Sequence, residues 1–155
     1  MGFRIQGLDF SQFRHLVGLS DEDLRERGVF RKVADSKPGF PDRIELRDAE
    51  PGEPLLLLNY IHQPVASPYQ ASHAIFILEY PKQQYDRIND IPAMLRSRMI
   101  SLRAFDSFGM MANAKLCAGT ELEPAIETLL DEPGTEYLHL HYAMRGCFAC
   151  RVDKL

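Results

Sequence analysis

The 155-residue sequence predicts an α+β fold with a mostly antiparallel sheet and three or four helices. Two observations indicate this class. Apolar residues recur mainly with a period of two, which is typical of strands, and only a few segments show helical spacing. The strand-like segments also follow one another in runs, whereas a parallel sheet would alternate strand and helix. No repeat or linker divides the chain, so we expect a single domain over residues 1–155.

Three elements are expected before Gly28. A short strand covers residues 2–7. A helix begins at Asp9 or Ser11, because the apolar residues that follow recur at three- and four-residue spacing: Phe10, Phe13, Leu16 and Val17. A second short helix opens at Ser20 with a capping-box pattern, and Gly28 ends it.

Strands dominate the remaining sequence. They are expected over residues 29–34, 43–46, 55–62, 72–80, 99–105, 108–116, 136–143 and 147–153. The unbroken leucines of 55–62 favour a central strand that is buried on both faces, with 72–80 as its antiparallel neighbour. Two helices interrupt the series, one from Pro92 to Ser97 and one from the capping box at Thr120 through Leu130. The last two strands form a hairpin.

Composition excludes several classes of function. The chain has 18 Lys and Arg against 22 Asp and Glu, and the basic residues are scattered, so we expect no nucleic-acid partner. No apolar run approaches the ~20 residues of a membrane helix, so no membrane association is expected. Three cysteines are an odd number and favour reduced thiols in a cytoplasmic protein. Phosphate-binding glycine motifs do not occur, which argues against nucleotide chemistry.

Short motifs along nearly the whole chain resemble one bacterial family. They are Asp35–Pro41, Asp48–Gly52, Leu57–Tyr60, Ser67–Tyr69, Ser72–Phe76, Ser101–Asp106 and His141 followed by Gly146-Cys147-Phe148. In this order they resemble the domain of unknown function numbered twelve-oh-three. The resemblance implies a small bacterial domain. It implies no activity, because none is established for the family.

The C-terminal segment holds the densest group of metal-binding side chains. His139 and His141 share one face of a strand. A two-residue hairpin loop at Arg145-Gly146 would pair His141 with Cys150, whereas a bulge at Gly146 would select Cys147 instead. Two imidazoles and a thiolate could bind zinc or another divalent metal, with a fourth position open for water or substrate.

The same residues have other interpretations. His139 and His141 could form hydrogen bonds within the sheet while the cysteines pack in the core, which is the more frequent arrangement. Cys147 with His141 could form a nucleophile–base pair, although no hydrolase signature surrounds it. A disulfide between Cys147 and Cys150 is disfavoured, because α-carbons three residues apart in a strand are ~10 Å apart. Cys117 is expected in the core.

A second pair of histidines flanks the loop 63–72. If the adjoining strands pair directly, His62 faces His73, and Tyr60 and Tyr69 complete the rim of a ligand pocket. In the alternative, one of these two imidazoles donates a hydrogen bond to a loop carbonyl and the other is exposed to solvent. Arg103 lies in an apolar strand, so it either forms an ion pair, with Asp106 or Asp35, or binds an anionic ligand group.

Two hypotheses of function follow. In the first, the protein has a small-molecule or metal site, either enzymatic or purely binding, in which Arg103 binds an anionic group. This site is lined by Tyr60, His62, His73, His139, His141 and a cysteine. In the second, the protein is a non-catalytic interaction or structural protein, and its histidines and cysteines serve packing. The first hypothesis requires the two histidine pairs to converge, which depends on tertiary structure.

Overall fold

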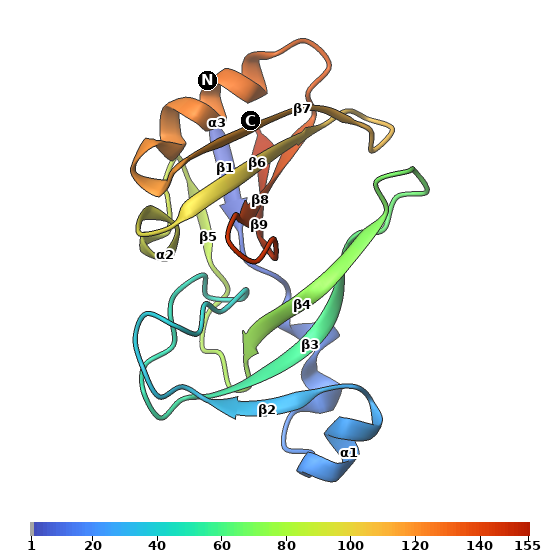
Figure 1. Cartoon of the computed structure of the whole chain (residues 1–155), viewed down its shortest axis with the longest axis vertical. Helices are drawn as coiled ribbons and strands as arrows, with labels where there is room; N and C mark the ends of the chain where they lie inside the picture. Colours follow the sequence, from blue (N-terminus) through green and yellow to red (C-terminus); the bar gives the residue numbers. More distant parts are fainter. Residues whose placement is uncertain (1) are drawn as a thin grey trace.

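The computed structural model describes residues 2–155 and contains two antiparallel sheets (Figure 1). The larger sheet has the order β5-β1-β9-β8-β6-β7, with β1 (Phe3–Gln6), β5 (Asp86–Ile88), β6 (Met99–Phe105), β7 (Met111–Ala118), β8 (Tyr137–Tyr142) and β9 (Phe148–Lys154). The smaller sheet has the order β2-β3-β4, with β2 (Phe30–Val33), β3 (Pro54–Gln63) and β4 (Ala71–Leu78). Three α-helices accompany them over these residues: α1 (Asp21–Glu26), α2 (Ala93–Arg96) and α3 (Leu122–Asp131). The predicted α+β class is confirmed.

The larger sheet buries one face against α3. Alternate residues of β6 and β8 point to this side, and Leu102 and Leu140 have no exposed surface. Helix α3 presents one apolar face to them, formed by Leu122, Ala125, Ile126, Leu129 and Leu130. Because strand side chains alternate, the other residues of β8 must point to the opposite face of the sheet. That face carries His139 and His141.

The smaller sheet has its own core. β3 lies between β2 and β4, as the leucine run predicted, and Leu56 and Ile77 are buried on one side of it. Burial on both faces holds only for the first half of β3, because Asn59 and Ile61 are exposed. Phe13, Leu16 and Leu24 from the N-terminal segment cover that side. Over residues 2–155, every helix is too short or too polar to cross a lipid bilayer.

Three local predictions are wrong. The apolar segment after Asp9 forms two 3-10 turns, Phe10–Gln12 and Arg14–Leu16, in place of an α-helix. Its apolar residues Phe10, Phe13 and Leu16 recur every three residues, which is the period of a 3-10 helix. Residues 43–46 form a loop, because the Asp42 carboxylate takes the backbone N–H of Glu45 that a strand would use.

The third error concerns the start of α3. Thr120 lies inside a 3-10 turn, Gly119–Glu121, and no side-chain hydrogen bond caps the helix that follows. The capping-box pattern therefore marks the right place in the chain but is not formed. The helix itself and its Pro124 in the first turn agree with the prediction.

The hairpin of β3 and β4 reaches from the smaller sheet to the larger one (Figure 1). Ser67 Oγ near its tip donates to the carbonyl of Gly109 at 3.0 Å, and Gln63 Nε2 donates to the hydroxyl of Tyr137 at 2.9 Å. The end of β3 therefore lies against the face of the larger sheet that carries His139 and His141.

Candidate metal centre

β8 presents two histidines on one face because of the alternation Tyr-Leu-His-Leu-His-Tyr. The strand lies between β9 and β6, and all six of its residues are buried. His139 lies opposite Arg103 of β6 and Arg151 of β9, while His141 lies opposite Ser101 and Phe148. The two imidazoles are thus held at the centre of a sheet, where their backbone has little freedom to move.

His62 arrives from the end of β3. The observed register pairs Tyr60 with His73, whereas the sequence predicted that His62 would face His73. A two-residue shift in partner keeps the side chains on their expected faces. A register shift between Tyr60 and Gln63 leaves His62 out of the regular pairing.

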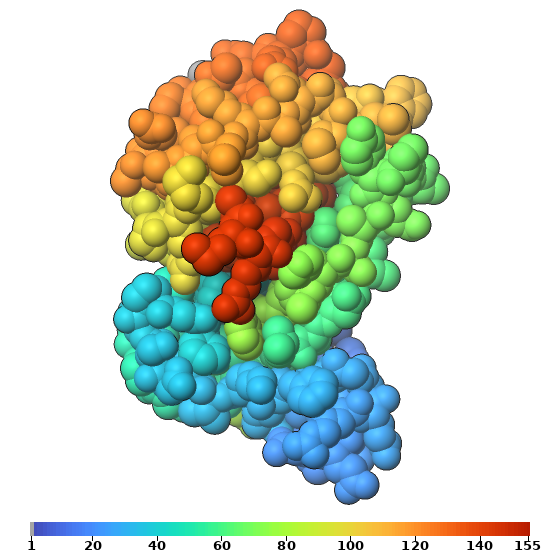
Figure 2. Space-filling model, in the orientation of Figure 1, coloured from blue at the N-terminus to red at the C-terminus, as the bar shows by residue number. Residues whose placement is uncertain are grey.

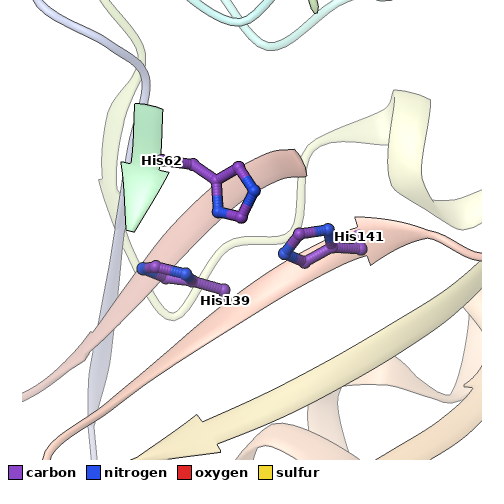
Figure 3. Close-up of side chains that lie close together, drawn as sticks. All are labelled: His62, His139 and His141. Carbon is purple, nitrogen blue, oxygen red and sulfur yellow. The ribbon is translucent and has the colours of Figure 1, made fainter. Parts of the chain in front are cut away.

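The structure brings His62, His139 and His141 together (Figure 3). One ligand nitrogen from each lies within 4.8 Å of the others. The ring centroids of His62 and His141 are 4.9 Å apart, and those of His62 and His139 are 5.9 Å apart. Convergence of the two histidine pairs therefore holds for three of the four imidazoles, and these three could hold a metal ion. His73 lies outside the cluster, and its Nδ1 contacts the carbonyl of Ala74 at 3.0 Å.

Each histidine of the cluster has a buried ring nitrogen without a hydrogen-bond partner among the described residues. These atoms are His62 Nδ1, His139 Nδ1 and His141 Nε2. The other nitrogen of His141, Nδ1, lies 2.9 Å from the carbonyl oxygen of Gly146. A carbonyl can only accept, so Nδ1 must carry the proton and the Nε2 of neutral His141 must carry a lone pair. His141 is held in a tautomer that suits a metal ligand.

Burial keeps these imidazoles neutral. Desolvation lowers the pKa of His62 from 6.5 to about 4, and it lowers the pKa of His139 and of His141 to about 3. Positive charge nearby acts in the same direction, since Arg103 lowers the pKa of all three rings. At neutral pH the rings hold no extra proton that a metal would have to displace.

Aromatic rings pack around the cluster. Phe148 of β9 stacks on His62 with an interplanar angle of 3° and contacts His139 and His141 edge-on. Phe105 and Tyr137 lie against His139. Phe148 was not among the predicted site residues, because an apolar ring in a strand carries no chemical signal in the sequence. The packing shields the cluster from water and limits the orientations that the rings can adopt.

Comparison with known proteins identifies the family. The family model described as "Protein of unknown function (DUF1203)" matches residues 39–154. The chain belongs to this family. The resemblance seen in its motifs is therefore confirmed, and the matched range includes all three histidines of the cluster. No curated protein and no solved structure matches the chain.

The cysteines of this DUF1203 protein lie outside the histidine cluster. Neither of the two alternatives for His141 is formed, because a bulge after Leu140 places Phe148, and not Cys150 or Cys147, opposite His141. Cys150 pairs with Leu140 and points into the core beneath α3. Cys147 lies in the hairpin loop, where its Sγ accepts a hydrogen bond from Arg43 at 3.2 Å. All three cysteines are free, and Cys117 is buried as expected.

The remaining predicted site residues lie at different distances from the cluster. Arg103 is half-buried beside His139, and its Nε donates weakly to Ser101 Oγ at 3.5 Å. Among residues 2–155 it has no ion pair, so the expected bridge to Asp106 or Asp35 is not formed. Tyr60 contacts Phe148, with ring centroids 6.0 Å apart, and Tyr69 contacts Phe105 at 6.4 Å near the hairpin tip.

Proposed function

We propose that His62, His139 and His141 bind one divalent transition-metal ion, with zinc as the first candidate, and that the metal binds a small anionic molecule. Three protein ligands with an open fourth position are typical of catalytic zinc sites, whereas structural sites use four protein ligands. The proposed centre is therefore one for ligand binding or catalysis. Imidazole also binds copper, iron and nickel, so the metal must be identified by experiment.

The observation that carries the proposal is the set of three unpartnered ring nitrogens. A buried polar atom without a partner costs roughly 1–3 kcal/mol, and each of the three rings that meet here carries one such atom. A single metal ion would satisfy all of them. Zinc–nitrogen bonds of about 2.0–2.1 Å in tetrahedral geometry place ligand nitrogens about 3.4 Å apart. Binding would therefore draw the nitrogens together from the present limit of 4.8 Å by rotation of the rings.

The charges around the cluster support an anionic ligand. The charged neighbours that shift the pKa values of the three histidines are all basic: Arg103, Arg151 and His73. A divalent ion held by three neutral imidazoles would leave this region with uncompensated positive charge. A ligand such as a carboxylate would supply the missing charge, with one oxygen on the metal and its other oxygen at Arg103.

Arg103 and Arg151 provide a comparison within the chain. Both lie opposite His139, one on each neighbouring strand. Arg151 donates to Asp153 at 2.7 Å and lies 4.0 Å from the ring of Tyr137, so its charge is already balanced. Arg103 has no acidic partner among the described residues. It is therefore the arginine that we assign to the anion.

Elemental analysis tests the metal. The protein is stripped with a chelator, incubated with zinc or cobalt, freed of excess metal and analysed. We expect one metal ion per chain in the wild type and at least a hundredfold loss of affinity in His139→Ala and in His141→Ala. His73→Ala is the matched control and should keep its metal, because His73 neighbours the cluster without belonging to it. Equal metal content in all variants, or none in the wild type, would rule out the proposal.

Cobalt spectroscopy tests the anion. Cobalt(II) in the site absorbs visible light, and an anion that enters the open position changes this spectrum. We expect acetate to bind about tenfold more weakly to Arg103→Gln than to the wild type, and equally well to Arg151→Gln. A spectrum that acetate does not alter would overturn the anion assignment while leaving the metal assignment intact.

A further inference from the structure

A cavity of about 620 Å³ lies apart from the histidine cluster. Its walls come from the loop between β8 and β9, from the segments 39–43 and 73–76, and from residues 97–99 after α2. In Figure 2 the red loop lies between the yellow, cyan and green segments that supply these other walls. The volume falls within the range of small-molecule sites, about 300–1,000 Å³. None of the three clustered histidines lines it.

The walls combine apolar surface with positive charge. Leu57, Phe76, Met99 and Met144 supply apolar side chains. Arg43, Arg98 and Arg145 are the basic residues of the lining. The lining includes no Asp or Glu from residues 2–155. A cavity of this kind fits a molecule with an apolar body and an acidic group.

The positive charge of Arg43 is buried and has no carboxylate partner. Its side chain is 1% exposed, and each of its side-chain nitrogens donates: Nε to the carbonyl of Phe148 at 2.8 Å, one terminal nitrogen to that of Pro41, and the other to Cys147 Sγ. None of these partners carries a full negative charge as a carboxylate would. In a low-dielectric environment an unbalanced charge acts strongly on a nearby ligand.

The neighbouring side chains do not remove this charge. Arg98 is balanced by Asp48, with the closer contact at 2.6 Å. Arg145 is exposed and forms no ion pair among the described residues. The ring of Tyr142 lies 5.2 Å from the Arg43 guanidinium and 5.0 Å from that of Arg98, and its buried hydroxyl has no partner among residues 2–155. The wall therefore carries a net positive charge and an unused hydroxyl.

We infer that this cavity binds an organic anion, with its acidic group toward Arg43 and Arg145 and its apolar body against Leu57, Phe76 and Met99. The site is separate from the proposed metal centre and does not depend on it. Loop 143–147 borders both, since Gly146 holds His141 and Cys147 lines the cavity.

Two fluorescent probes test the inference. Anilinonaphthalene sulfonate has an apolar body and a sulfonate group, and N-phenyl-1-naphthylamine has the same body without the charge. We expect the sulfonate probe to bind at least about tenfold more tightly to the wild type. Arg145→Gln should weaken the sulfonate probe about three- to fivefold and leave the neutral probe unchanged. Arg25→Gln in α1 is the control, and it should alter neither affinity.

Cys147 reports where the probe binds. Its thiol is half-buried at the cavity wall, whereas Cys117 and Cys150 are buried. A saturating concentration of the sulfonate probe should slow alkylation of Cys147 by iodoacetamide severalfold, as measured by mass spectrometry. Ala74→Phe, which fills the cavity from β4, should abolish this protection. Equal affinity for the two probes, or undiminished alkylation of Cys147 when the probe is bound, would overturn the inference.

Discussion

The histidine cluster and the loop 41–48 both bury polar groups, but they satisfy them in opposite ways. In the loop, the Asp42 carboxylate accepts from the backbone N–H groups of Leu78 and Glu45, and Arg43 donates to Phe148 and Pro41. In the cluster, one ring nitrogen of each histidine has no partner among the described residues. Both regions lie between the two sheets, so their surroundings are comparable.

The difference separates polar groups whose hydrogen bonds hold the fold together from polar groups that no part of the described fold uses. Asp42 ties the loop to β4, and Arg43 ties it to β9, so each hydrogen bond fixes one part of the fold to another. The unpartnered nitrogens of the cluster stabilise nothing in the absence of a ligand. We expect substitutions in the loop to lower stability, and substitutions in the cluster to change binding more than stability.

The largest effect is expected for Arg43→Met. Methionine keeps the apolar stem, but the carbonyls of Phe148 and Pro41 lose their donors, each at a cost of roughly 1–3 kcal/mol. We expect the free energy of unfolding, measured with urea, to fall by about 4 kcal/mol. Arg47→Met in the same loop is the control. Its guanidinium is partly exposed, so loss of the bond to Glu53 should cost about 1 kcal/mol or less. Similar losses in the two variants would contradict the structural role of Arg43.

A smaller effect is expected from the ionisation of Asp42. Burial raises the pKa of this carboxyl from 3.8 to about 6, although its backbone hydrogen bonds act in the opposite direction. Between these values the folded state holds a proton that the unfolded state has released, so stability falls as pH rises from about 4 to about 6. Between pH 4 and pH 7 the loss amounts to about 2.4 kcal/mol. Asp42→Asn should remove this loss of stability. Urea unfolding of the wild type and of the variant at pH 4 and pH 7 would measure the difference. An identical pH dependence in both would refute the assignment.

The histidines are expected to respond to pH with the opposite sign. The pKa of His139 is about 3 when folded and 6.5 in its ordinary state. Below pH 6.5 the unfolded chain binds a proton that the folded chain does not, so stability falls as pH decreases. Between pH 7 and pH 5 the metal-free protein should lose about 2 kcal/mol through His139. The free energy of unfolding of His139→Leu should fall by about 2 kcal/mol less than that of the wild type between pH 7 and pH 5. An equal fall in both proteins would show that His139 takes up the proton in the folded state.

Much of this fold follows from local sequence patterns. The alternation in 137–142 and the leucine run in 55–62 predict the two strands, and they assign the side chains to faces because successive strand residues point to opposite sides of a sheet. The period of two predicts a strand over 43–46, whereas the backbone N–H of Glu45 bonds to the Asp42 side chain, and no periodicity reveals such a competition. The segment after Asp9 has both three- and four-residue spacings and therefore predicts an α-helix, whereas the structure follows only the three-residue spacing of Phe10, Phe13 and Leu16.

The site was only partly predictable. Sequence alternation places His139 and His141 on one face, but it does not show that the end of β3 brings His62 to the same face. That contact depends on the β3–β4 hairpin, whose tip is held by Gly109, far away in sequence. The choice of partner for His141 also depends on a bulge after Leu140, and its position depends on how β8 pairs with β9. Long-range contacts of this kind leave no periodic signal.

The smallest effect on stability is expected for His139→Leu at pH 7.5 without metal. Leucine has a similar volume and removes a buried nitrogen that has no partner among residues 2–155, so the free energy of unfolding should stay constant or rise by up to about 1 kcal/mol. Gln63→Leu is the matched control, because Gln63 is equally buried but donates to the Tyr137 hydroxyl at 2.9 Å. It should lose about 1–2 kcal/mol. If His139→Leu is destabilised as much as Gln63→Leu, His139 must have a structural hydrogen bond in solution, and the contrast between a satisfied loop and an unsatisfied cluster fails.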